Sequence, residues 1–214
     1  MGHEFKDASY NRNHMTDLCK LADIYRVDKC PKYNHTYTPE YDKLLSPLRN
    51  DTKLLLEIGI GNIPLMKGLT AADYKPGASL RMWRDYFPNA QIIGCDILSN
   101  VQFEENRIKT FITDQGNVDS LNTLIKNVQA YQSEPDIILD DGSHEEQHMV
   151  TSFKTLWKAL KPGGIYIIED VRLTFYDRIT NLHNEFGFHD AELVKAYKGR
   201  DLWDNFVVFR KRSV

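Results

Sequence analysis

Five short apolar runs, each of four to six residues, constrain the fold of this chain more than any other feature. A continuous apolar run of that length is typical of a strand buried on both faces, as in a parallel sheet. Helical patterns separate most of the runs, which predicts an α/β fold with a mostly parallel, doubly wound sheet. The expected strands are Lys53–Ile58, Gln91–Cys95, Ile108–Ile112, Asp136–Leu139 and Ile165–Ile168, and the expected helices are Ser79–Tyr86, Val118–Val128 and Glu145–Leu160.

The two ends of the chain have different patterns. Apolar residues recur at helical spacing over Asp17–Tyr25, and a second helix is expected from Pro39, a favoured first residue of a helix, to Leu48. Near the other end, Glu192–Tyr197 and Phe206–Arg210 have the pattern of an antiparallel hairpin. We expect a helical segment over residues 1–50, whose Tyr/His-rich connector forms the rim of a site, and an α/β unit over residues 51–214, together forming a single domain.

Composition and charge exclude several classes of protein. The 214 residues are 42% hydrophobic and 27% charged, which rules out wholesale disorder. A formal net charge of −3 gives no broad basic surface for nucleic acid, since only Arg210–Arg212 is locally basic. Three cysteines cannot all pair, and we find neither a signal peptide nor an apolar run of transmembrane length. We expect a cytoplasmic protein that binds neither nucleic acid nor a membrane.

Acidic residues stand at the ends of all five expected strands. In an open α/β sheet, ligands bind in the crevice at the carboxyl ends of the strands. One acid at such a position is common, whereas acids at five strand ends in a row indicate a site. These polar residues are Glu57 at the first strand end, Asp96 at the second, Asp114 and Gln115 at the third, Asp140 and Asp141 at the fourth, and Glu169 and Asp170 at the fifth.

The turn after the first strand indicates the kind of ligand. Gly59 and Gly61 would let the backbone approach a ligand closely, but Pro64 stands where a dinucleotide fingerprint has its third glycine. An acidic turn would repel a pyrophosphate, while Asp96 suits the hydroxyls of a ribose. The combination favours an adenosine ligand without phosphates, that is, S-adenosylmethionine. The alternative is that both glycines only make a tight turn.

Three carboxylates are expected to converge after the fourth and fifth strands. Adjacent parallel strands lie about 5 Å apart, which would bring Asp141, Glu169 and Asp170 together. Carboxylates without a thiolate or imidazole between them make a hard oxygen site, suited to Mg²⁺ and also to Mn²⁺ or Ca²⁺. The alternative is that Asp141 and Asp170 only cap helices.

The segment Ser143–Glu146 has the pattern of a capping box, with Ser143 as N-cap and Glu146 three residues later. That pattern places His144 in the first turn of a helix, at the mouth of the crevice. The helix dipole there disfavours the charged imidazole, which would leave His144 able to accept a proton, whereas the nearby carboxylates favour the charged form. His148, one turn later, is expected at the surface.

Together, these segments resemble the magnesium-dependent sugar O-methyltransferases of the class I S-adenosylmethionine fold, the group of the macrolide-sugar (mycinamicin- and macrocin-type) enzymes. The glycine turn alone is a weak signal, whereas Asp140–His144 followed by Ile168–Asp170 is much more diagnostic. The resemblance covers about Asp17–Val171 and rests on Leu21–Tyr25 with Asp28–Lys29, Tyr37–Tyr41, Leu56–Gly61, Gly77–Trp83, Asp114–Gln115, Asp140–His144 and Ile168–Asp170.

The resemblance implies a Rossmann-like class I methyltransferase in which residues 51–214 form the S-adenosylmethionine-binding catalytic domain. Asn62–Pro64 is poorer in glycine than in many relatives, and the stretch Arg172–Phe188, where acceptor specificity usually resides, is short. The implied metal ligands are Asp141, Glu169 and Asp170, the implied catalytic residues are His144 and Asp141, and the implied cofactor contacts are Tyr37, Glu57, Gly59, Gly61, Ser79, Asp96, Asp114 and Gln115.

The implied reaction is methyl transfer to a hydroxyl of a small sugar substrate, either a nucleotide-sugar or a glycoside. A divalent metal would lower the cost of deprotonating that hydroxyl, and His144 would take the proton. The alternatives are a catechol-type methyltransferase and a non-enzymatic Rossmann-like ligand-binding protein. We also expect a homodimer or larger assembly, in which a neighbour's segment Lys29–Tyr41 closes the active site.

Overall fold

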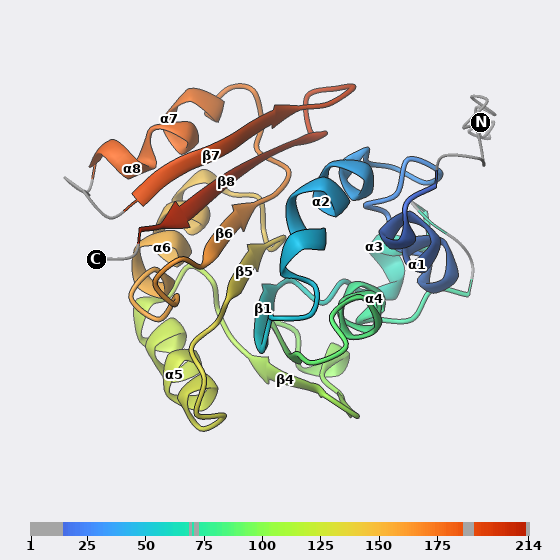
Figure 1. The fold of residues 1–214 in the computed structure, drawn as a ribbon, viewed down its shortest axis with the longest axis horizontal. Helices are drawn as coiled ribbons and strands as arrows, with labels where there is room; N and C mark the ends of the chain where they lie inside the picture. Colours follow the sequence, from blue (N-terminus) through green and yellow to red (C-terminus); the bar gives the residue numbers. More distant parts are fainter. Residues whose placement is uncertain (1–14, 69, 71–72, 186–190, 213–214) are drawn as a thin grey trace.

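An eight-stranded mixed sheet runs through the middle of the molecule in the order β3-β4-β2-β1-β5-β6-β8-β7 (Figure 1). The structure is a computed structural model, and it describes residues 15–68, 70, 73–185 and 191–212. The strands are β1 (Leu54–Ile58), β2 (Gln91–Asp96), β3 (Glu104–Glu105), β4 (Ile108–Ile112), β5 (Ile137–Asp140), β6 (Ile165–Ile168), β7 (Ala191–Lys198) and β8 (Asn205–Lys211).

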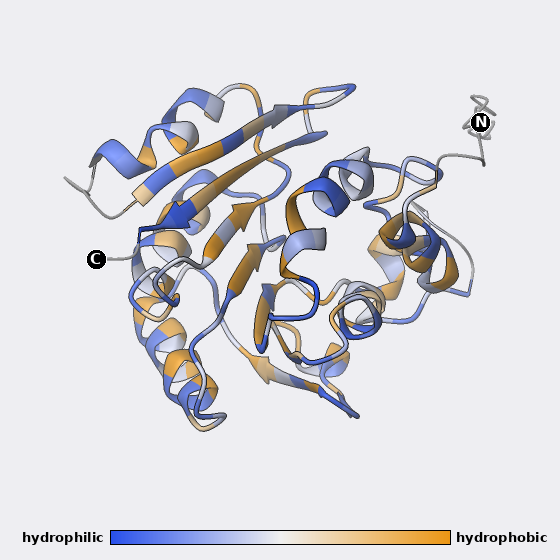
Figure 2. Cartoon of the chain, in the orientation of Figure 1, coloured by the Kyte–Doolittle hydropathy of each residue, from blue (hydrophilic) through white to orange (hydrophobic). Residues whose placement is uncertain are grey.

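The five central strands of the sheet, β4, β2, β1, β5 and β6, are parallel. At the two edges, β3 and the β7–β8 hairpin pair antiparallel. The predicted mostly parallel sheet with a C-terminal antiparallel hairpin is therefore confirmed. Figure 2 shows β1, β5 and β6 as largely hydrophobic and β7 as mixed, which is the difference between strands covered on both faces and a strand at the edge.

Helices cover both faces of the sheet (Figure 1). One face carries α1 (Asp17–Tyr25), α2 (Tyr37–Leu45), the short turns η2 (Ser46–Leu48) and α3 (Ile63–Met66), and α4 (Ala78–Tyr86). The other carries α5 (Val118–Gln129), α6 (Glu146–Leu156), α7 (Tyr176–Thr180) and α8 (Leu182–Glu185), and a further short turn, η3 (Ser99–Val101), follows β2.

Side chains of the central strands alternate between two cores. Leu55 of β1 joins the core under α1, α2 and α4, whereas its neighbours Leu54 and Leu56 join the core under α5 and α6. This alternation is the two-residue period of a strand, and each large apolar side chain buried in this way contributes about 1.5–3 kcal/mol. The sheet is therefore anchored on both faces, and its carboxyl edge is held rigidly.

The helix α2 begins two residues before the predicted start at Pro39. The backbone N–H groups of Tyr37 and Thr38 both donate to the carbonyl of Lys29, at 3.1 Å each. The connector thus satisfies donors that a helix start otherwise leaves unpaired, which lets the helix begin earlier.

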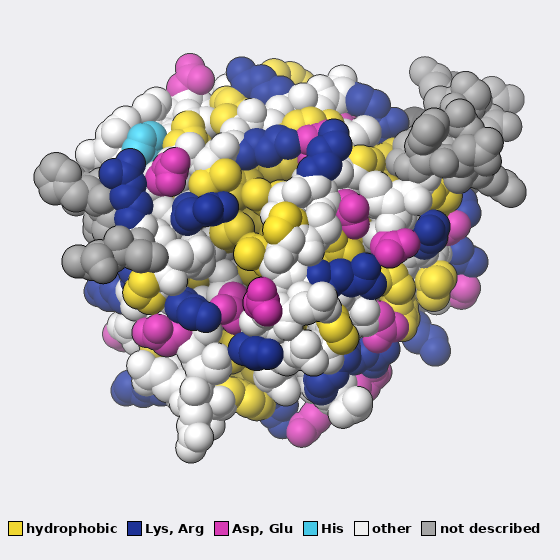
Figure 3. Space-filling view, in the orientation of Figure 1, with side chains coloured by type: hydrophobic (Ala, Val, Ile, Leu, Met, Phe, Trp, Pro, Cys, Tyr) yellow, Lys and Arg dark blue, Asp and Glu magenta, His cyan; other side chains and the backbone are white. Residues whose placement is uncertain are grey.

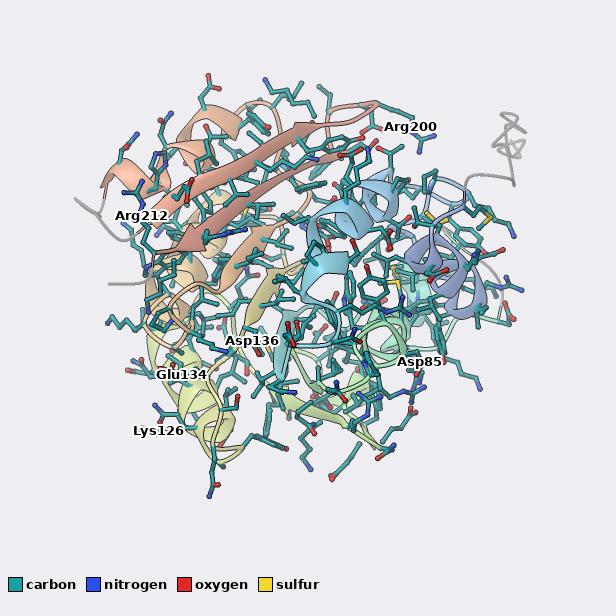
Figure 4. All side chains as sticks on the ribbon, viewed as in Figure 1. Asp85, Lys126, Glu134, Asp136, Arg200 and Arg212 are labelled. Carbon is teal, nitrogen blue, oxygen red and sulfur yellow. The ribbon has the colours of Figure 1, made fainter. Side chains whose placement is uncertain are left out.

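The connector before α2 contacts the loop between β7 and β8. The carboxylate of Asp204, in the loop between β7 and β8, accepts hydrogen bonds from the backbone N–H (2.8 Å) and hydroxyl (2.7 Å) of Thr36. Arg200 lies at the tip of that hairpin (Figure 4). The hairpin therefore closes over the N-terminal connector.

The surface mixes both signs of charge. On the face drawn in Figure 3, Lys and Arg side chains are interspersed with Asp and Glu, and hydrophobic side chains lie between them. Within the described part of the chain, no helix is both long and apolar enough to cross a membrane.

Candidate active site

The carboxyl ends of the parallel strands open onto a cavity of about 660 Å³. The cavity extends across the ends of β2 and β4 on one side of β1, and across the ends of β5 and β6 on the other. Residues near 27–35 and 201–203, far apart in the sequence, complete its wall. Of the residues predicted from the sequence, it is lined by Gly59, Gly61, Ser79, Asp96, Asp114, Gln115, Asp141, His144 and Asp170.

The turn after β1 depends on glycine. Gly59 has φ +97° and Gly61 has φ +74°, both in the left-handed region. A Cβ atom on Gly59 would lie 2.0 Å from the carbonyl oxygen of Asp141, and one on Gly61 would lie 2.4 Å from the hydroxyl of Tyr74. A side chain is therefore excluded by backbone conformation and by packing alike. The glycines do make a tight turn, and that turn also lines the cavity.

Asp96, at the end of β2, is held by two backbone groups. Its Oδ2 accepts a hydrogen bond from the N–H of Ile60 (2.9 Å), and its Oδ1 accepts one from the N–H of Leu98 (2.9 Å). These bonds hold the carboxylate at the cavity wall between two turns. The position suits an acid that accepts hydrogen bonds from the hydroxyls of a ribose.

Asp114 and Gln115 follow β4 and form the wall beside Asp96. Asp114 accepts a hydrogen bond from the N–H of Gly116 (2.9 Å). The buried Gln115 amide donates to Asp140 (2.6 Å), and its carbonyl oxygen accepts from the N–H of Ser143 (2.9 Å). Gln115 thus ties the loop after β5 to the end of β4, a structural role that the sequence did not indicate.

The other end of the cavity is acidic. The backbone N–H of Asp141 donates to Ile58 and that of Glu169 donates to Asp140, both at 2.9 Å. The parallel ladder therefore continues one residue past β5 and β6, and it brings the carboxylates of Asp141, Glu169 and Asp170 close together, as strand adjacency predicted. We call these three residues, together with Asp28 and Glu57 beside them, the acidic edge.

Lys29 lies in the middle of the acidic edge, which the sequence analysis missed. Its Nζ is 2.5 Å from Asp141 Oδ2, 2.6 Å from Glu169 Oε2 and 3.8 Å from Glu57 Oε1, and its side chain is only 1% exposed. Burial alone would lower the pKa of Lys29, but the carboxylates of Asp141 and Glu169 more than offset that effect. The pKa of Lys29 therefore lies well above its usual value, because these ion pairs favour the charged ammonium.

Two buried glutamates share that cation. Glu169 also accepts from the hydroxyl of Tyr41 (2.8 Å), and Glu57 Oε2 accepts from the hydroxyl of Ser79 (2.9 Å). Burial raises the pKa of Glu57 to about 7, with Lys29 opposing the shift. Glu57 is fully buried and does not line the cavity, and its predicted contact with a cofactor stays a prediction.

His144 faces two of the acids. Its Nε2 is 3.9 Å from Asp141 Oδ1 and 3.6 Å from Asp170 Oδ2. One atom from each of these three side chains lies within 4.8 Å of the others, a spacing that can hold a metal ion. Clustered carboxylate oxygens with an excess of negative charge fit a hard divalent cation such as Mg²⁺. Glu169, the third predicted ligand, stays a prediction, because both its oxygens accept hydrogen bonds from Lys29 and Tyr41.

The predicted capping box is wrong. α6 begins at Glu146 with Glu145 as its N-cap, and His144 precedes the helix with a left-handed φ of +56°. The hydroxyl of Ser143 lies 2.9 Å from His148 Nδ1 and accepts only a long hydrogen bond (3.4 Å) from the N–H of Glu145. Because this hydroxyl is engaged by His148, it does not cap the helix. His148, expected at the surface, lines the cavity.

A second histidine approaches Asp170 from the connector before α2. His35 Nε2 is 3.5 Å from Asp170 Oδ1, and His35 Nδ1 is 3.5 Å from Asp204 Oδ1. Burial would lower the pKa of His35, but Asp204 and Asp170 outweigh it and raise that pKa. The Tyr/His-rich connector therefore does reach the rim of the cavity, and the β7–β8 loop holds it there.

Tyr37 contacts both Asp170 and His35 from the buried side of the site. Its hydroxyl donates to Asp170 Oδ1 (2.5 Å), and its ring stacks on His35 with the ring centroids 4.7 Å apart. The ring also packs edge-on against Phe206, and the residue is fully buried outside the cavity lining. The hydroxyl of Tyr37 thus faces Asp170, and the predicted contact of Tyr37 with the cofactor stays a prediction.

No protein-family model matches the chain. It is 36% identical over 162 residues to mycinamicin VI 2''-O-methyltransferase of Micromonospora griseorubida, and 36% identical over 160 residues to demethylmacrocin O-methyltransferase of Streptomyces fradiae. The chain is homologous to macrolide-sugar O-methyltransferases. Each alignment covers 75% of this chain, but the homologous region is only 37% and 38% of the two relatives.

Solved structures agree with this homology. The methyltransferase MycE of the mycinamycin biosynthetic pathway, in complex with Mg, SAH and mycinamycin VI, has a TM-score of 0.69 at 28% identity, over 93% of this chain and 55% of that chain. The O-methyltransferase TomG from Streptomyces achromogenes has a TM-score of 0.58 at 16% identity, over 93% of this chain and 91% of that chain. The class I methyltransferase fold expected from the sequence is confirmed.

Proposed function

We propose that this chain transfers the methyl group of S-adenosylmethionine to a hydroxyl of a sugar, with a divalent cation held at the acidic edge. The observation that carries the proposal is the position of His144, whose Nε2 faces Asp141 and Asp170 at the rim of the cavity. The names of the homologous proteins support the same reaction, since those proteins are O-methyltransferases of glycosylated polyketides.

The cofactor end of the cavity lies between β1 and β4. Asp96 would accept hydrogen bonds from the ribose hydroxyls, and the exposed backbone of the Gly59–Gly61 turn would lie against the methionine part. Asp114 stands at the wall where the adenine would lie. S-adenosylmethionine supplies an activated methyl group, so the remaining task of the protein is to hold and deprotonate the acceptor.

The acidic edge would hold the cation through Asp141 and Asp170, and Glu169 stays a predicted third ligand. A divalent cation lowers the cost of removing a proton from an alcohol and orients neighbouring hydroxyls. Mg²⁺ fits the oxygen donors, with Mn²⁺ and Ca²⁺ as alternatives. His144 takes the acceptor proton at Nε2.

The acceptor end of the cavity is built from two segments that lie far apart in the sequence. Asn34, His35, Asp201 and Trp203 line it beside Asp170. Trp203 is 39% exposed, and the guanidinium of Arg172 lies 4.1 Å from its ring centroid. An aromatic surface flanked by polar groups suits a sugar ring, and the relatives favour a glycoside over a nucleotide-sugar as the substrate.

A methyl-transfer assay tests this proposal. S-adenosylmethionine with a labelled methyl group is incubated with glycosides, nucleotide-sugars and catechols, in Mg²⁺ and in excess chelator. We expect transfer to a glycoside with neighbouring hydroxyls, and we expect chelation to abolish it. Binding of S-adenosylhomocysteine, measured by calorimetry, should persist in chelator because the cation serves the acceptor.

Three outcomes would contradict the proposal. Turnover of catechols alone would favour the catechol-type alternative. Cofactor binding without any metal-dependent transfer would favour a ligand-binding protein. Full activity after dialysis against chelator would exclude the cation.

A homodimer or larger assembly stays a prediction, to be checked by light scattering. Within one chain, the segment from Lys29 to Tyr41 contacts the acidic edge, and closure of the site by the same segment of a neighbour stays a prediction.

A further inference from the structure

Lys29 orients the carboxylates of Asp141 and Glu169, because its ammonium donates to one oxygen of each. It donates to Oδ2 of Asp141, so that Oδ1 is the oxygen nearer His144. The same ammonium donates to Oε2 of Glu169, and the other oxygen of Glu169 accepts a hydrogen bond from the hydroxyl of Tyr41. Glu169 is thereby held behind the site by hydrogen bonds at both oxygens.

Tyr37 orients Asp170 in the same way. Its hydroxyl binds Oδ1, while Oδ2 lies 3.6 Å from His144 Nε2. Asp141 and Asp170 thus each have one oxygen anchored by a buried group and one oxygen directed at the histidine. For Asp141, that buried group is the Lys29 ammonium.

The backbone of Lys29 ties this cation to the fold. Its carbonyl accepts from Tyr37 and Thr38, the first residues of α2. The position of the ammonium is therefore coupled to the start of that helix. A lysine so placed is a fixed part of the site.

We propose that Lys29 is a positioning residue, a built-in counter-ion that keeps the acidic edge folded and turns Asp141 Oδ1 toward His144 before any divalent cation binds. Removing one partner of a buried ion pair leaves an uncompensated charge, which is strongly destabilising. Without Lys29, the buried carboxylates would need another cation. The inference rests on the proposed function only for the choice of Mg²⁺ as that cation.

The test measures thermal unfolding of the whole chain without cofactor or acceptor, in chelator and in saturating Mg²⁺. We expect a small Mg²⁺ shift of Tm in the parent. Lys29→Met should lower Tm by about 6–20 °C in chelator, and Mg²⁺ should restore part of the loss. The matched control is Lys161→Met, which removes the exposed pair with Asp136 (2.8 Å; Figure 4) at the opposite end of the strands. That variant should lose no more than about 4 °C and show the parent's Mg²⁺ shift.

A second variant separates charge balance from a general folding defect. Lys29→Met combined with Glu169→Gln removes a buried carboxylate together with its cation, so it should be more stable in chelator than Lys29→Met alone. If Lys29→Met is insoluble, a folded double variant still supports the proposal, and an unfolded double variant overturns it.

Two further results would overturn the proposal. One is a Lys29→Met protein with the parent's Tm in chelator. The other is a destabilised Lys29→Met protein whose Mg²⁺ shift equals that of the parent, because Lys29 would then be structural without balancing the charge of the acidic edge. Neither depends on finding an acceptor, so failure of the methyl-transfer assay leaves this test intact.

Discussion

At the scale of single residues, His144 combines an unusual backbone with a directed side chain. Its φ of +56° lies in the left-handed region, which is unfavourable for a residue with a Cβ atom by about 1–2 kcal/mol. Its imidazole is 25% exposed, with Nε2 facing Asp141 and Asp170. Such strain persists where the surrounding structure enforces it, and it is concentrated at functional sites.

Replacing this histidine tests its proposed role. We expect His144→Ala to lower kcat by about 10²–10⁴, because the acceptor proton loses its base. The affinity for S-adenosylhomocysteine should hardly change, and the dependence of kcat on pH should differ from that of the parent, because the base is gone. His183→Ala, on α8, is the control and should match the parent. A near-normal kcat with an unchanged pH profile would leave His144 as a turn residue only.

At the scale of elements, the β7–β8 loop is held by one carboxylate. Asp204 is 1% exposed and accepts from the N–H and hydroxyl of Thr36 and from the N–H of Arg200. Burial would raise the pKa of Asp204, but hydrogen bonds from His35, Arg200 and Thr36 outweigh it and lower that pKa well below its usual range. The ionised carboxylate of Asp204 therefore stabilises the loop that carries Trp203.

Asp204→Asn should cost about 1.5–3 kcal/mol at neutral pH, since it removes charge-assisted hydrogen bonds. A carboxyl whose pKa is lowered in the folded state contributes stability above its unfolded pKa of about 3.9, and that contribution is lost as the pH falls further. The gap between parent and variant, measured by urea unfolding, should thus narrow below about pH 4. Asp119→Asn, on the exposed start of α5, is the control. A gap that stays constant down to pH 2 would contradict the assignment.

Elements with a regular pattern could be predicted, and contacts without one could not. α1 and β4 occupy the residues that their periodicity indicated, whereas α3, α7 and α8 are four or five residues long and too short for a helical period. The adjacency of β5 and β6 was enough to predict that Asp141 and Glu169 lie close together. Lys29 reaches them across 112 and 140 residues of sequence from an irregular connector, so no local pattern marks its position.

At the scale of the whole molecule, we assign different roles to the two ends of the cavity. Asp96 lies at the proposed cofactor end, beside the turn after β1, and Trp203 lies at the proposed acceptor end, on the hairpin loop. The two ends are built from different parts of the sheet. Changes at one end should therefore leave binding at the other largely intact.

Calorimetry can separate the two ends. Asp96→Asn should weaken S-adenosylhomocysteine binding by roughly tenfold, because it removes charged acceptors for the ribose hydroxyls. Trp203→Ala should bind S-adenosylhomocysteine like the parent while raising KM for the sugar acceptor. NAD should bind to neither variant nor the parent. Equal losses of cofactor affinity in both variants would show that the cavity does not divide in this way.

The position of β8 has a consequence for how the chain matures during synthesis. β8 follows β7 in the sequence, yet it lies between β6 and β7 and pairs with both. A nascent chain that has emerged only as far as β7 therefore has an unpaired edge at β6 and a strand with no place in the sheet, both of which invite pairing with other chains. The turn after β1 and the end of β2 are complete by then, but Asp204 is still missing. On the ribosome, the end of the cavity that we assign to the methyl donor can thus form before the wall that we assign to the sugar.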